Sequence, residues 1–147
     1  MLERSSEEGS GRMAMTLRWL ALTIGIACVA IGVFHFILGI DSVPGEGNTG
    51  ATVDSRERFY AAIFLGYGIA WIWAARQSPV PSTTVRWLSG IFLLGGVGRL
   101  LSMVIHGQPY WFQVALTVLE LTLPLLFYWL SATRKLPSTN LTNQRIR

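Results

Sequence analysis

Apolar residues are gathered into four long blocks along this chain of 147 residues, and polar stretches separate the blocks. The blocks cover approximately residues 17–40, 58–75, 85–106 and 111–131. Each is close to the roughly 20 residues that a helix needs to cross about 30 Å of hydrocarbon. Because the connections between blocks are short, consecutive helices are expected to be neighbours. The pattern predicts an all-α membrane protein, a four-transmembrane-helix bundle with up-down-up-down topology.

The polar stretches at the two ends predict tails outside a transmembrane domain that covers residues 17–132. Residues 1–16 combine both charge signs with Gly and Ser, a composition that favours a disordered cytoplasmic tail. Residues 133–147 are polar and basic and predict a second cytoplasmic tail. Arg12 and Arg18 would also suit a cleaved signal peptide, but the block that follows is longer than a typical signal-peptide core. The chain is 51% hydrophobic and 14% charged, which leaves no room for a separate soluble domain.

Basic residues are distributed unequally between the two ends of the predicted helices. Those on one side are Arg4, Arg12, Arg18, Arg76, Arg86, Arg134, Lys135, Arg145 and Arg147. Only Arg56 and Arg58 lie near the opposite side, and Arg99 lies inside the third block. The positive-inside rule therefore predicts a multi-pass membrane protein with both termini in the cytoplasm. The excess of basic over acidic residues follows from this topology. The lipid bilayer is therefore expected as a partner, and nucleic acid is not.

Arg99 is the residue that most needs explanation, because a charge at the centre of a membrane helix costs roughly 2.5–3.5 kcal/mol. Its expected partner is Glu120 in the fourth block or Glu57 at the start of the second. Counting 1.5 Å per helical residue places polar residues from all four blocks between the bilayer midplane and the outer boundary. These candidates for a ligand-binding or polar cluster are His35, Glu57, Arg58, Tyr60, Arg99, Ser102 and Glu120.

Two interpretations of this cluster remain open at the level of sequence. It could be an ion-pair network that only holds the helices in register. It could instead line a pocket for a small molecule or lipid headgroup, with Arg99 and Arg58 as anion partners and His35 as a titrating group. The single cysteine, Cys28, excludes a multi-cysteine metal site, and no metal-binding, cofactor-binding or catalytic motif is present. We therefore assign no metal ligand, cofactor or catalytic residue.

Several short segments also resemble a known family. The residues that carry the resemblance are Glu-Arg-Phe-Tyr-Ala-Ala at 57–62, Gly-Arg-Leu-Leu-Ser at 98–102, and Glu120 before the last apolar stretch. They are similar to the domain-of-unknown-function 4345 family of small bacterial four-span membrane proteins, over about residues 17–132. The resemblance implies a four-helix, multi-pass protein of the bacterial plasma (inner) membrane and brings no reaction, substrate or cofactor with it.

The functional hypothesis follows from the cluster and the membrane topology together. We expect an integral membrane protein with an accessory role, or one that binds a lipid or other small ligand in the outer half of the bundle. A further membrane protein is the other partner that this interpretation allows. The alternative is a membrane-embedded enzyme acting on a lipid or isoprenoid, with Glu120 and His35 as acid and base and Arg99 as electrostatic stabiliser. The sequence favours the non-enzymatic role and leaves the enzymatic one open.

Overall fold

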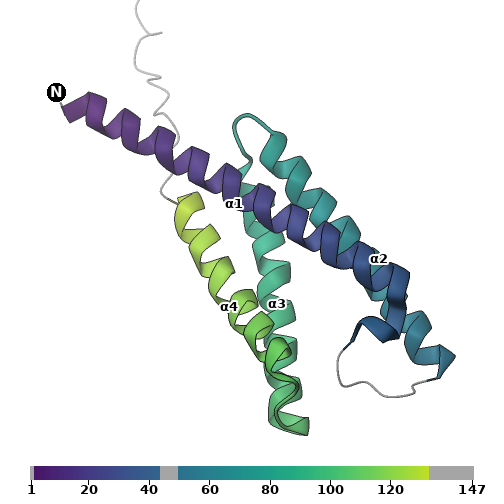
Figure 1. Ribbon diagram of the computed structural model, residues 1–147. Coiled ribbons are helices and arrows are strands. Elements are labelled where there is room, and N and C mark those ends of the chain that lie inside the picture. Colours follow the sequence, from purple (N-terminus) through teal and green to yellow (C-terminus); the bar gives the residue numbers. More distant parts are fainter. Residues whose placement is uncertain (1, 44–49, 133–147) are drawn as a thin grey trace, which may run out of the picture.

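The computed structural model describes residues 2–43 and 50–132, and these residues are almost entirely helical (Figure 1). The elements are α1 (Leu2–Leu38), the short 3₁₀ helix η1 (Gly39–Ser42), α2 (Ala51–Arg76), α3 (Ser82–His106) and α4 (Trp111–Ala132). No strand occurs within the described ranges. The predicted all-α class is therefore confirmed.

Each of the four long helices is long and apolar enough to cross a membrane. Most of their large hydrophobic side chains are exposed on the outside of the molecule, as in Trp87 (74% exposed) and Val104 (82%). Such a surface suits hydrocarbon and would be costly in water. The chain is thus a multi-pass membrane protein with four spans in its described part. The alternation of their directions across the bilayer stays a prediction.

The first helix differs from the prediction at its start. It begins at Leu2, so the described part of the segment 1–16, which the sequence analysis assigns to a tail, continues α1 as a helix. Once the apolar part of α1 has formed, adding residues of high helix propensity such as Met13, Ala14 and Met15 needs no new nucleation. The predicted tail at 133–147 and the loop residues 44–49 lie outside the described residues.

The helices associate as two pairs, α1 with α2 and α3 with α4, and the pairs contact each other much less than their own members do. The α1–α2 pair is close because glycines remove side chains from its interface. A Cβ on Gly32 would lie 2.8 Å from the backbone nitrogen of Leu65, and one on Gly68 would lie 2.7 Å from that of Val29. Small residues that let two backbones approach are the usual means of helix association in membranes.

Replacing Gly68 with alanine is therefore expected to separate α1 from α2. Overpacking a tight contact costs about 1–3 kcal/mol, and here the obstruction is backbone that cannot turn aside. Gly66 provides the control, because it lies on the same helix with nothing within 4 Å of its added Cβ. Thermal unfolding in detergent should show a clear loss for Gly68→Ala and none for Gly66→Ala. Equal stability of the two variants would contradict the glycine interface.

One end of the bundle holds the hydrophobic core and is called the closed end here. Its buried residues are Leu17, Ala21, Trp71, Ala74, Ala75, Val80, Val85, Leu88, Phe127 and Leu130. The rings of Trp71 and Phe127 join the two pairs, with centroids 4.6 Å apart. Tyr67 adds a hydrogen bond from its hydroxyl to the Leu88 carbonyl, 2.5 Å away. The closed end therefore fastens the pairs together.

From the closed end the two pairs diverge (Figure 1). The end of α1 and the start of α2 lie apart from the end of α3 and the start of α4, and we call this the open end. Arg58 stabilises the turn between α1 and α2 there. It donates hydrogen bonds to the Phe36 and Ile37 carbonyls (2.7 and 2.8 Å) and to Asp54 Oδ2 (2.9 Å), while Asp54 Oδ1 accepts from the Ile40 amide. These bonds satisfy carbonyls that the end of a helix leaves without partners.

Candidate functional site

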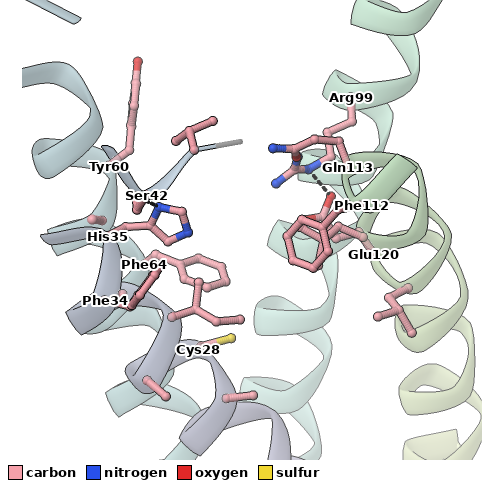
Figure 2. Close-up of a pocket in the computed structure, with 18 of the residues that line it drawn as sticks. Cys28, Phe34, His35, Ser42, Tyr60, Phe64, Arg99, Phe112, Gln113 and Glu120 are labelled. Carbon is pink, nitrogen blue, oxygen red and sulfur yellow. Dashed lines mark hydrogen bonds and ion pairs between the residues drawn. The ribbon is translucent and has the colours of Figure 1, made fainter. Parts of the chain in front are cut away.

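A pocket of about 950 Å³ occupies the space between the two pairs at the open end. All four long helices contribute to its lining. Its floor is apolar and includes Ile24, Phe64, Phe92 and Leu123. Of these, Ile24 and Leu123 pack against the buried core. Two polar clusters face each other nearer the open end, one on each pair (Figure 2).

The first cluster, which we call the His35 cluster, consists of His35, Ser42 and Glu57. His35 lies in the last turn of α1, and its Nδ1 is 2.6 Å from Ser42 Oγ and 3.3 Å from Glu57 Oε1. Ser42 can return to α1 because Gly39 has a φ of +60°, a left-handed conformation that favours glycine. The cluster thus joins α1, η1 and α2.

The hydrogen bonds of Ser42 also assign the tautomer of His35. The Ser42 hydroxyl donates to the Gly39 carbonyl at 2.5 Å, so its oxygen is left to accept from His35 Nδ1–H. In the neutral ring Nε2 is then the acceptor. Figure 2 shows this second ring nitrogen directed toward the space between the pairs. His35 is therefore held through Nδ1, and Nε2, the acceptor of the neutral ring, faces the pocket.

The second cluster, the Arg99 cluster, consists of Arg99 on α3 with Gln113 and Glu120 on α4. Arg99 Nε lies 2.9 Å from Glu120 Oε2, and a terminal nitrogen of Arg99 donates to Gln113 Oε1. Glu120 is only 9% exposed. It fits against α3 because Gly96 has no side chain, and a Cβ there would approach Glu120 Cβ to 3.1 Å. Of the two partners that the sequence leaves open for Arg99, the structure shows Glu120.

The predicted site residues separate into those that line the pocket and those that do not. His35, Glu57, Tyr60, Arg99 and Glu120 line it. Arg58 does not, because its guanidinium is committed to Asp54 and to the carbonyls at the end of α1. Ser102 is exposed and also lies outside the lining. The expected role of Arg58 as an anion partner within the pocket is therefore corrected to a structural one.

The structure adds lining residues that the predicted cluster lacks. Gln113 shares a helical stripe with Glu120, so its spacing of seven residues could have identified it. Ser42 reaches His35 only through the turn of η1, and no sequence pattern marks this contact. Trp111 and Phe112 line the mouth as well, and Figure 2 shows the Phe112 ring projecting between the pairs.

The lining can hold an elongated molecule with one polar end. The floor offers aromatic and aliphatic surface, including Phe92, which stacks on Tyr67 with ring centroids 5.9 Å apart. The polar clusters offer charge and hydrogen bonds only toward the open end. Cys28 is a small buried residue in the pocket wall. Within residues 2–43 and 50–132, no three His, Cys, Asp or Glu side chains are grouped to hold a metal ion.

Comparison with known proteins identifies the family. A family model described as "Domain of unknown function (DUF4345)" matches residues 16–131, which is most of the chain. The chain belongs to the DUF4345 family. No curated protein and no solved structure matches it. Membership agrees with the four apolar helices of this multi-pass membrane protein, and the pocket lies entirely within the matched DUF4345 region.

Proposed function

We propose that this DUF4345 protein binds an amphipathic small molecule or lipid in the pocket between its two helix pairs. The observation that carries the proposal is the pocket of about 950 Å³, which has a size typical of ligand sites and is lined by all four long helices. Its apolar floor suits a hydrocarbon portion, and its two polar clusters suit a headgroup. A pocket open between membrane helices also lies where lipids and lipid-like molecules are concentrated.

Binding is favoured over catalysis by the way the ionisable groups are paired. Arg99 is engaged by Glu120, and His35 Nδ1 lies beside Glu57. In the alternative enzyme, Glu120 would have to exchange protons while it balances the Arg99 charge. A carboxylate that serves as a counter-ion suits a binding site better. Turnover of a bound molecule in the experiment below would favour the enzymatic alternative.

The proposal is tested by filling the pocket. Ala27 lines the pocket, so Ala27→Trp should occupy its space, whereas the neighbouring Ile26 is 59% exposed and outside the lining. We expect native mass spectrometry of the protein extracted in mild detergent to detect a bound small molecule or lipid. Ala27→Trp should lower its occupancy about tenfold, a change of about 1.4 kcal/mol. Ile26→Trp should leave it unchanged, and equal occupancy in the two variants would contradict the proposal.

We also propose that the closed end faces the cytoplasm of a bacterial cell, across the plasma membrane, and that the open end faces outward. The closed end carries Arg18, Arg76 and Arg86, as the positive-inside rule expects of a cytoplasmic surface. Both termini would then be cytoplasmic. A reporter enzyme that works only outside the plasma membrane should be inactive when fused after Arg147. Activity of that fusion would reverse the orientation.

A further inference from the structure

The chemistry of the pocket lining points to the charge of the ligand. Two carboxylates, Glu57 and Glu120, line the pocket with one guanidinium, that of Arg99. The other titratable lining groups within the described residues are His35, Cys28, Tyr60 and Tyr110. Counted as in the whole chain's formal charge of +4, with histidine neutral, the lining carries a formal charge of −1.

The guanidinium of Arg99 is not available to an anionic ligand without a loss elsewhere. It is held at 2.9 Å by Glu120 and also donates to Gln113. An anion that took Arg99 would remove the counter-ion of a carboxylate that is nine-tenths buried. Leaving a buried charge without its partner is strongly unfavourable. The second carboxylate, Glu57, would also repel the anion from across the pocket.

The two polar clusters also present hydrogen-bond acceptors. One oxygen of each carboxylate is engaged within its cluster, Glu57 Oε1 at 3.3 Å from His35 Nδ1 and Glu120 Oε2 at 2.9 Å from Arg99 Nε, so each carboxylate has a second oxygen beyond its pair. In the neutral ring, His35 Nε2 is a further acceptor, because Nδ1 is engaged by Ser42. A ligand that completes these contacts must bring donors or a positive charge.

Aromatic rings at the mouth favour the same kind of ligand. Tyr60 lines the mouth from α2, and Trp111 and Phe112 line it from α4. The faces of such rings attract ammonium groups, by about 0.5–1 kcal/mol at exposed sites and by about 2 kcal/mol in desolvated ones. Carboxylates and aromatic faces together make a site that discriminates cations from anions.

We infer that the ligand is a cationic amphiphile, whose ammonium group is bound by Glu57, Glu120 and the aromatic mouth. This inference rests on the proposed function and adds the charge class of the ligand to it. The hydrocarbon portion of the amphiphile lies against the apolar floor formed by residues such as Phe64, Phe92 and Leu123.

The test compares two amphiphiles that share a decyl chain and carry headgroups of opposite charge. The purified protein, in a neutral maltoside detergent, is titrated with decyltrimethylammonium and with decyl sulfate, and the tryptophan fluorescence is followed because Trp111 lines the pocket. We expect the ammonium compound to bind at least about tenfold more tightly, a difference of about 1.4 kcal/mol. Non-specific attraction to a chain of charge +4 would produce the opposite preference.

Matched variants assign the preference to the pocket. Glu57→Gln and Glu120→Gln should each reduce the affinity for decyltrimethylammonium by about tenfold. Asp41→Asn should not, because Asp41 is an exposed acid at the same end of the molecule and outside the lining. Glu57 is the safer of the two sites, since its side chain is 30% exposed and its replacement leaves the Arg99–Glu120 pair intact.

Each other outcome has a definite meaning. Decyl sulfate binding as tightly as the ammonium compound, with both lost in Ala27→Trp, would overturn the inference and leave the proposed function standing. A preference for the cation that Asp41→Asn removes, or that both Gln variants keep, would also overturn the inference. Failure of both amphiphiles to bind the wild-type protein would contradict the inference and the proposed function together.

Discussion

Replacing Trp71 with alanine is expected to lower the free energy of unfolding in detergent by about 3 kcal/mol. Trp71 is 1% exposed and packs on Phe127 across the boundary between the two helix pairs. Truncating a buried tryptophan costs about 3–5 kcal/mol in water-soluble proteins. The lower figure applies here because helices in an apolar solvent gain packing energy on association but little from the transfer of side chains out of water.

Trp71→Phe and Trp73→Ala serve as controls for this effect. Phenylalanine keeps an aromatic ring at the contact with Phe127, so its cost should be well below that of alanine. Trp73 lies two residues away on α2 and is 57% exposed, so its truncation should have little effect on stability. Reversible unfolding followed by circular dichroism measures all three. A Trp71→Ala protein as stable as Trp73→Ala would show that the closed end does not hold the pairs together.

Arg99→Leu is expected to have the second largest effect, a loss of about 2–3 kcal/mol. Breaking a buried ion pair costs about 3–5 kcal/mol because the remaining charge is left without a partner. The cost is reduced here because the Arg99 side chain is 37% exposed, while that of Glu120 is 12% exposed. The loss arises from the stranded Glu120 carboxylate, so it should shrink when the pH is lowered and the carboxylate takes up a proton.

The double variant Arg99→Leu/Glu120→Leu identifies the source of the loss. With both charges gone, no buried carboxylate remains, and the double variant should be more stable than Arg99→Leu alone. Arg56→Leu provides a control on an exposed arginine outside the pocket. The same unfolding measurement applies. If the double variant is less stable than Arg99→Leu by as much as Glu120→Leu alone destabilises the wild-type protein, the two residues act independently.

The fold could be read from sequence in most respects because membrane spans depend on length and composition alone. The three later helices agree with the predicted blocks to within a few residues, except that α2 starts at Ala51 rather than near 58. The start of α1 could not be predicted, because a polar segment does not reveal that it continues a long helix. Hydropathy thus identifies each membrane-spanning helix, whereas the residue at which a helix begins depends on cooperative helix extension.

The sequence predicted part of the pocket lining and not its arrangement. Depth along each helix correctly selects Arg99 and Glu120 as neighbours, since the cost of a membrane charge demands a partner. Depth also selects Arg58, but its direction around α2 takes it to Asp54 and the end of α1 instead. Whether four helices form one polar network or two clusters depends on the angle between the pairs. That angle follows from contacts between the pairs, such as Trp71 on Phe127, which no sequence pattern marks.

The two pairs are joined at the closed end and diverge from it, so a small rotation of one pair about the closed end displaces its open end by a larger amount. A helix of about 25 residues is about 37 Å long, so a rotation of about 5° at one end displaces the other by about 3 Å. The glycine contacts between α1 and α2 hold these two helices together along their length, so that they would rotate as one pair. A substitution at the closed end that rotated one pair would therefore change the width of the pocket without touching its polar clusters. By this geometry, a small change in the packing of Trp71 on Phe127 would change the width of the pocket at the open end by an amount comparable to the size of a headgroup.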